Sequence, residues 1–131
     1  MNYALSLMQR GEYEETLGYF TRAMEFLPTY SYLHINMGIL KNAMGFPEEA
    51  EVYYMNAVRY DRGNPESYHY LARFLMGNNR NQEAADWVAK GLKISPAHDG
   101  LNKMKEKLQV STLSTEDKLK NQEIMGQMQY Y

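Results

Sequence analysis

The sequence contains no cysteine. This absence excludes disulfide bonds, thiolate catalysis and cysteine-ligated zinc. No apolar run approaches the roughly 20 residues that a membrane-spanning helix needs, and the first ten residues lack the basic-then-apolar layout of a secretion signal. The net charge is only −2, so no broad basic field favours nucleic acid as a partner. We expect a soluble protein with no membrane insertion, cytoplasmic if this chain is complete.

Signatures of catalytic and cofactor sites are also missing. The chain has no phosphate-binding loop, no dinucleotide fingerprint and no nucleophile elbow. His34, His69 and His98 do not pair at the helical spacing of a metal site, so we expect structural or surface roles for them. The acidic clusters at 12–15 and 48–51 suit the positive ends of helices better than paired catalytic carboxylates. We therefore expect no enzymatic activity, no cofactor and no metal.

A period of 34 residues runs through most of the chain. Gly11, Gly45 and Asn79 are separated by this interval. Three further sets keep the same spacing: Thr16, Ala50 and Ala84; Phe20, Tyr54 and Val88; Ala23, Ala57 and Gly91. A fixed period of this size predicts a stack of similar helical units, and 44% hydrophobic content suffices for one domain with a core.

Each period contains the pattern of two helices. The apolar spacing and the breaks between segments predict helices at 2–10, 13–27, 32–44, 47–60, 66–77, 82–94 and 99–109. Gly45 ends one helix and Pro47 suits the first turn of the next. Asn81 and Asp99 are expected helix N-caps. We divide the chain into repeats at 1–30, 31–64 and 65–98, a capping helix at 99–110 and a weakly helical tail at 111–131.

The side chains at fixed places in the period predict how the helices pack. Small residues at Ala4, Gly38 and Ala72 are expected where the two helices of a unit cross, because a large side chain would hold the axes apart. Larger residues are expected to fill the spaces between helices: Tyr19, Phe20, Phe26, Tyr53, Tyr54, Tyr68, Leu71 and Trp87.

The repeated pattern is specific enough to name a family. The residues that carry it are, in the first unit, Gly11, Tyr13, Thr16, Phe20, Ala23 and Pro28, in the second unit 38 to 57, and in the third Leu71-Ala72 to Pro96. This pattern resembles the tetratricopeptide repeat family over about residues 1–98. The resemblance implies an all-α, right-handed α-solenoid of three helix pairs with a C-terminal capping helix, whose first helices line a concave groove for peptides or partner proteins.

By this resemblance, the groove is lined by a set of mostly apolar and aromatic side chains. They are Leu5, Met8, Tyr32, Ile35, Asn36, Ile39, Asn42, His69, Tyr70, Arg73 and Met76. Family members that bind acidic chaperone tails use several basic and amide residues, of which only Asn36 has a counterpart here. Glu66 and Tyr70 stand where basic residues would be needed. An apolar groove suits an amphipathic helix or an extended hydrophobic segment instead, unless neighbouring helices or the tail cover it.

The favoured function is a non-catalytic protein–protein interaction scaffold, with Asn36, Asn42, His69 and Arg73 setting the register of the partner. Only ten residues precede Gly11, so the first unit is short. The alternative is therefore an accessory repeat domain excised from a larger protein, since the repeats also resemble C-terminal extensions of bacterial membrane glycosyltransferases and polysaccharide polymerases. A third possibility is self-assembly into a homo-oligomer through exposed repeat ends.

Overall fold

The computed structural model describes residues 12–109, and this part of the chain is helical without strands. Its helices are α2 (Tyr13–Phe26), α3 (Ser31–Ala43), α4 (Pro47–Tyr60), α5 (Pro65–Gly77) and α6 (Asn81–Ile94), followed by helical residues 99–109. These bounds agree with the expected ranges to within one residue, and the all-α class is confirmed. The expected helix at 2–10 and the tail at 111–131 lie outside the described residues.

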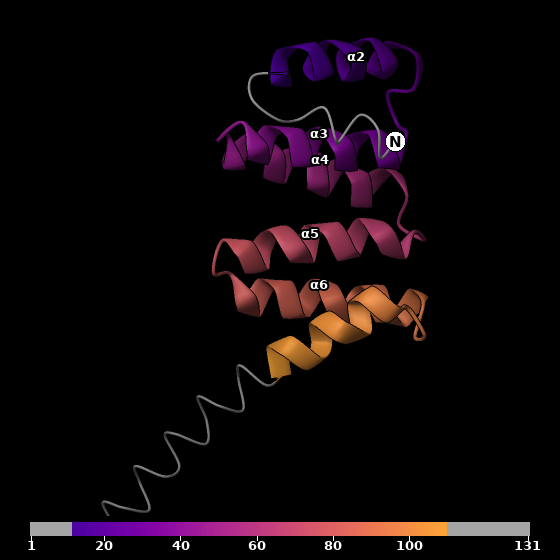
Figure 1. Ribbon diagram of the computed structural model, residues 1–131. Coiled ribbons are helices and arrows are strands. Elements are labelled where there is room, and N and C mark those ends of the chain that lie inside the picture. The colour runs from indigo at the N-terminus through magenta and orange to yellow at the C-terminus, as the bar shows by residue number, and fades with distance from the viewer. Residues whose placement is uncertain (1–11, 110–131) are drawn as a thin grey trace, which may run out of the picture.

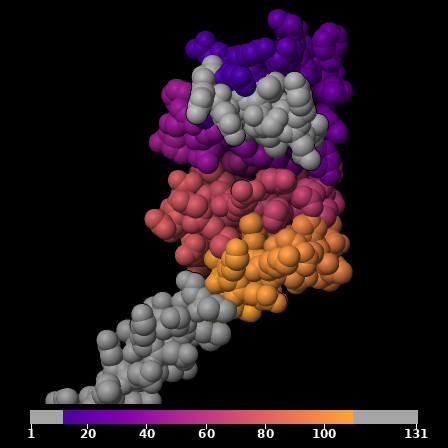
Figure 2. Space-filling model, viewed as in Figure 1, coloured from indigo at the N-terminus to yellow at the C-terminus, as the bar shows by residue number. Residues whose placement is uncertain are grey.

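The helices stack in chain order. Figure 1 shows α2 to α6 lying side by side as successive layers, with residues 99–109 against α6 at one end. The space-filling view shows the same order of layers (Figure 2). First helices begin at Ser31, Pro65 and Asp99, each 34 residues after the last, and second helices begin at Pro47 and Asn81 with the same interval. The described chain is thus an α-helical repeat solenoid.

The link between the two helices of a unit is the same turn in both described copies. Gly45 has a φ of 89° and Asn79 a φ of 62°, the left-handed region that glycine and asparagine adopt most readily. In each copy, the amide after this residue donates to a carbonyl five positions earlier, from Phe46 to Lys41 and from Arg80 to Leu75, both at 2.9 Å. This is the hydrogen bond of a Schellman turn, so the expected stop at Gly45 is confirmed.

Two expected helix caps are wrong. Asn81 lies inside the first turn of α6, which has no side-chain cap. Asp99 is already helical, and the residue before it provides the cap instead: Nδ1 of His98 accepts a hydrogen bond from the Leu101 amide at 3.1 Å. A true asparagine cap occurs at Asn64, whose side chain accepts from the Glu66 amide at 3.1 Å at the start of α5.

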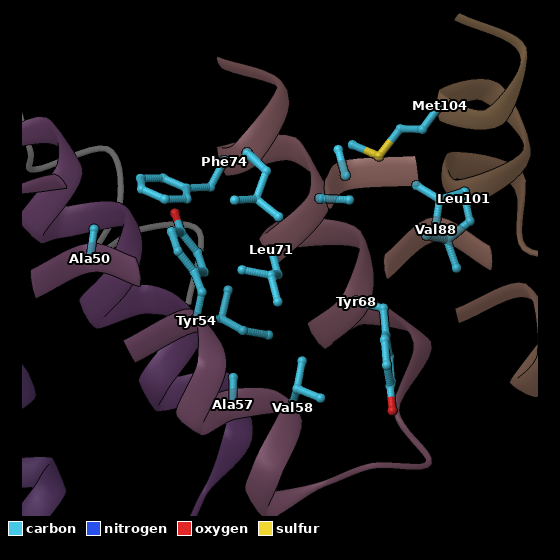
Figure 3. Close-up of a cluster of buried hydrophobic side chains, with 14 of the residues drawn as sticks. Ala50, Tyr54, Ala57, Val58, Tyr68, Leu71, Phe74, Val88, Leu101 and Met104 are labelled. Atoms are coloured by element: carbon cyan, nitrogen blue, oxygen red, sulfur yellow. The ribbon is translucent and has the colours of Figure 1, made fainter. Parts of the chain in front are cut away.

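Small residues permit close helix packing at two places, as expected. A Cβ atom on Gly38 would lie 2.9 Å from ring atoms of Tyr54, and one on Gly91 would lie 2.8 Å from Cδ1 of Leu101. Figure 3 shows the resulting core, in which Leu71 lies between Tyr54 on one side and Val88 on the other. A smaller cluster between α2 and α3 completes the described core: Phe20, Leu33, Met37 and Leu40.

The expected large core residues do not all reach the core. Phe20, Tyr54, Tyr68 and Leu71 are buried, and Tyr53 and Trp87 are half-buried. Tyr19 and Phe26 are 53% and 82% exposed, so their assignment to the core was wrong. Phe26 occupies the last turn of a second helix, and the same place in the period is exposed at Tyr60 and Ile94. Side chains at this place lie beyond the neighbouring helix rather than against it.

Within residues 12–109, no helix combines the length and the apolar character that crossing a membrane requires.

Candidate functional site

A cavity of about 490 Å³ opens between the first helices of two successive units. It is lined by side chains from α3, α4, α5 and the turn after α5: Ile39, Asn42, Tyr54, Tyr70, Arg73, Phe74, Gly77 and Asn78. The repeat explains this position. Ile39 and Arg73 are 34 residues apart, so the same face of α3 and α5 is turned toward the cavity.

The structure brings four of the expected groove residues together and separates the others from them. Ile39, Asn42, Tyr70 and Arg73 line the cavity. Of the rest, Leu5 and Met8 lie outside the described residues, and the following do not line it: Tyr32, Ile35, Asn36, His69 and Met76.

The residues outside the cavity have different surroundings. Ile35 and Asn36 are only 2% and 3% exposed, so neither side chain is open to a partner. Tyr32 and Met76 are partly buried against the larger core cluster. His69 packs beside His98, with ring centroids 5.6 Å apart.

Sequence reasoning missed the other half of the lining. Tyr54 was expected only as a core residue, because it belongs to a second helix. Phe74, Gly77 and Asn78 lie at the end of α5. Their signal was the spacing from Tyr70, because positions four and seven residues later fall on the same helix face.

Aromatic contacts fix the inner wall of the cavity. The rings of Tyr54 and Phe74 have centroids 5.2 Å apart, and Figure 3 shows the hydroxyl oxygen of Tyr54 next to the Phe74 ring. Because Gly38 leaves no space behind the Tyr54 ring, the phenol cannot shift without moving α3. The apolar part of the wall is therefore rigid.

The polar groups of the cavity are mainly hydrogen-bond donors. Burial raises the pKa of the Tyr54 hydroxyl well above its ordinary value, an effect that Arg73 reduces and Tyr70 increases. Within the described residues, no carboxylate lies within ion-pair distance of Arg73. None of the lining residues is acidic. The cavity therefore combines one positive charge with neutral donors and an apolar wall.

The histidines have structural surroundings. Nε2 of His34 donates to the Pro28 carbonyl at 2.7 Å, and Nε2 of His98 pairs with the Glu66 carboxylate. Burial lowers the pKa of His69; Glu66 counters this shift, and His98 and Arg73 add to it. In the part of the chain that the structure describes, no three histidine or acidic side chains are grouped to hold a metal ion.

A second cavity, of about 710 Å³, lies between α6 and residues 99–109, at the end of the stack. Apolar and small side chains make up most of its wall, with two lysines: Ala85, Val88, Ala89, Leu92, Lys93, Lys105, Leu108 and Gln109. Nothing in the sequence analysis pointed to this cavity.

Comparison with known proteins identifies the fold. No protein-family model matches the sequence, and no curated protein matches it at a significant level. Among solved structures, the tetratricopeptide-repeat (TPR) domain of Sgt2 from Aspergillus fumigatus has a TM-score of 0.73 at 17% identity, covering 88% of this chain and 78% of that one.

Two further structures are similar to the same extent. The first TPR of Spaghetti (RPAP3), bound to the HSP90 peptide SRMEEVD, has a TM-score of 0.71 at 17% identity, with 86% and 91% coverage of this chain and that chain. The pilF protein of Pseudomonas aeruginosa has a TM-score of 0.73 at 18% identity, with 85% and 51% coverage. Together with the 34-residue succession of helix pairs, these similarities show that the chain has the tetratricopeptide-repeat fold.

Proposed function

We propose that this protein is a non-catalytic scaffold that binds a segment of another protein, a peptide, helix or subunit, in the cavity between α3 and α5. The observation that carries the proposal is the meeting of four expected groove residues, Ile39, Asn42, Tyr70 and Arg73, in one cavity. They come from corresponding faces of two repeats, which is how stacked repeats form a shared binding surface.

The chemistry of the cavity suits a polypeptide ligand. Its volume of about 490 Å³ falls within the roughly 300–1,000 Å³ typical of ligand sites. Burial of partner side chains against Ile39, Tyr70 and Phe74 would supply most of the binding free energy. Asn42 and Arg73 would fix the register through hydrogen bonds to the partner.

The peptide in the Spaghetti (RPAP3) structure supports this proposal through fold alone. A shared fold does not specify a shared ligand, because function depends on the side chains of the site. The argument for binding therefore rests on the cavity of this chain.

The test is a selection of random peptides displayed on phage against this chain, followed by affinity measurements with the selected peptides. We expect Ile39→Ala and Tyr70→Ala each to weaken binding by about tenfold or more, since both remove side chains from the cavity wall. Val52→Ala is the control, because Val52 is exposed on α4 and lies outside the cavity. Circular dichroism should show equal helicity in all three variants. Unchanged binding by both cavity variants would place the peptide site elsewhere.

A further inference from the structure

The Tyr54 hydroxyl is a buried donor that the fold leaves without a partner. Tyr54 is 4% exposed and lines the cavity, yet its hydroxyl makes no hydrogen bond within the described residues. Tyr68 is the contrast: it is 7% exposed, and its hydroxyl donates to the Arg62 carbonyl at 2.9 Å. A buried polar group without a partner costs about 1–3 kcal/mol, so the unsatisfied hydroxyl points to an acceptor from outside the fold.

Arg73 adds an unneutralised positive charge to the same cavity. It is exposed and has no ion pair within the described residues. Arg80 is the contrast, because its guanidinium binds both Glu51 and Glu83. Arg73 is close enough to Tyr54 to affect its ionisation. With no acidic residue in the lining, the complementary group is an anion with acceptor oxygens.

We propose that the cavity binds a carboxylate of the partner polypeptide, which accepts a hydrogen bond from the Tyr54 hydroxyl and pairs with the Arg73 guanidinium. This inference rests on the proposed function, that the cavity binds a protein segment. A carboxylate has two acceptor oxygens, so it can satisfy both donors at once. Ile39 and Phe74 in the same wall would hold an apolar side chain next to the acidic group.

The proposed site differs from the acidic-tail site considered from sequence. Asn36, the one residue that matched that pattern, is buried at 3% exposure and does not line the cavity. Tyr54 comes from α4, a second helix, which the sequence comparison did not include among groove helices. Because burial raises the pKa of the Tyr54 hydroxyl, the phenol keeps its proton and remains a donor at neutral pH.

Four short peptides test the inference on the full chain by two-dimensional NMR titration. Acetyl-Phe-Asp-Phe-amide is compared with acetyl-Phe-Asn-Phe-amide, and acetyl-Phe-Phe with a free C-terminus is compared with its amide. We expect at least one acidic peptide to bind about tenfold more tightly than its neutral counterpart, with shifts centred on Tyr54 and Arg73. The pair that shows the difference identifies the source, a side-chain or a terminal carboxylate. Equal binding within both pairs, or no binding by any peptide, would overturn the inference.

Two variants locate the carboxylate. Tyr54→Phe and Arg73→Gln should each reduce the preference for the acidic peptide by about threefold or more, while affinity for the neutral peptide stays the same. Tyr53→Phe and Arg59→Gln are the controls, since both residues are on α4 and neither lines the cavity. Urea unfolding should show that Tyr54→Phe is as stable as the parent, because its hydroxyl has no partner to lose.

The outcomes separate the inference from the proposed function. If Ile39→Ala weakens all four peptides while Tyr54→Phe and Arg73→Gln leave the preference for the acidic peptide unchanged, the cavity binds polypeptide and the carboxylate assignment is wrong. If the acidic peptide loses affinity in Tyr54→Phe and Arg73→Gln but not in the two controls, both proposals are supported.

Discussion

At the scale of single residues, the same chemical group has different surroundings at different places in the repeat. Two buried tyrosines, Tyr54 and Tyr68, differ in that only the second has a hydrogen-bond partner. Two arginines, Arg73 and Arg80, differ in that only the second has carboxylate partners. In each pair, the residue without a partner lines the cavity. Unsatisfied groups gathered in one place are more typical of a binding site than of packing.

His69 makes folding stability depend on pH. Burial lowers its pKa, so the unfolded chain takes up a proton as the pH falls below the ordinary value of about 6.5, while the folded chain does so only at lower pH. Because the unfolded state then binds more protons, stability falls with falling pH below about 6.5. We expect His69→Gln to reduce the loss of stability between about pH 7.5 and about pH 5, measured by urea unfolding. Glu66 and His98 titrate in both proteins and form the common background. An identical pH profile would show that His69 is not responsible.

At the scale of helices, the crossing of α3 and α4 depends on one missing side chain. A Cβ atom at Gly38 would lie 2.9 Å from the Tyr54 ring, so Gly38→Ala should destabilise the protein by about 1–3 kcal/mol through overpacking. The matched control is Gly18→Ala in α2, where no heavy atom of the described chain lies within 4 Å of the new Cβ. There the better helix propensity of alanine should stabilise by about 0.5–1 kcal/mol. Opposite signs in thermal unfolding would confirm the packing argument, and equal effects would contradict it.

The ends of the helices show which local rules sequence can supply. Gly45 and Asn79 occupy the same place in the period, and both take the left-handed conformation, as expected from residue type and spacing. The start of the last helix was harder to predict. Asp99 is the better cap by residue preference, but His98 provides the acceptor because it is held by Glu66 from α5. A contact between two units decided this cap, and local sequence does not contain that contact.

At the scale of the whole molecule, the period predicts the stack but only part of the site. Helix order and bounds follow from spacing, since each unit repeats the same packing problem. The site depends on small rotations of each helix. Ile35 and Asn36 adjoin lining positions in sequence, yet a step of about 100° per residue turns both side chains into the core. Tyr54 has the opposite history: its place in the period reads as core, and only the gap between α3 and α5 exposes it to the cavity.

A stack of repeats also predicts how the molecule loses its structure. Leu101 is fully buried between α6 and residues 99–109, so Leu101→Ala should cost about 2–5 kcal/mol. Because each layer contacts mainly its neighbours, the loss of protection in hydrogen exchange should be greatest in α6 and residues 99–109 and least in α2. The smaller cluster of Phe20, Leu33, Met37 and Leu40 does not include the mutated residue, which gives α2 its separate support. Lys107→Ala, an exposed change in the same helix, is the control. An equal loss of protection in every described helix would instead show a single cooperative unit, and the layered account of its stability would then be wrong.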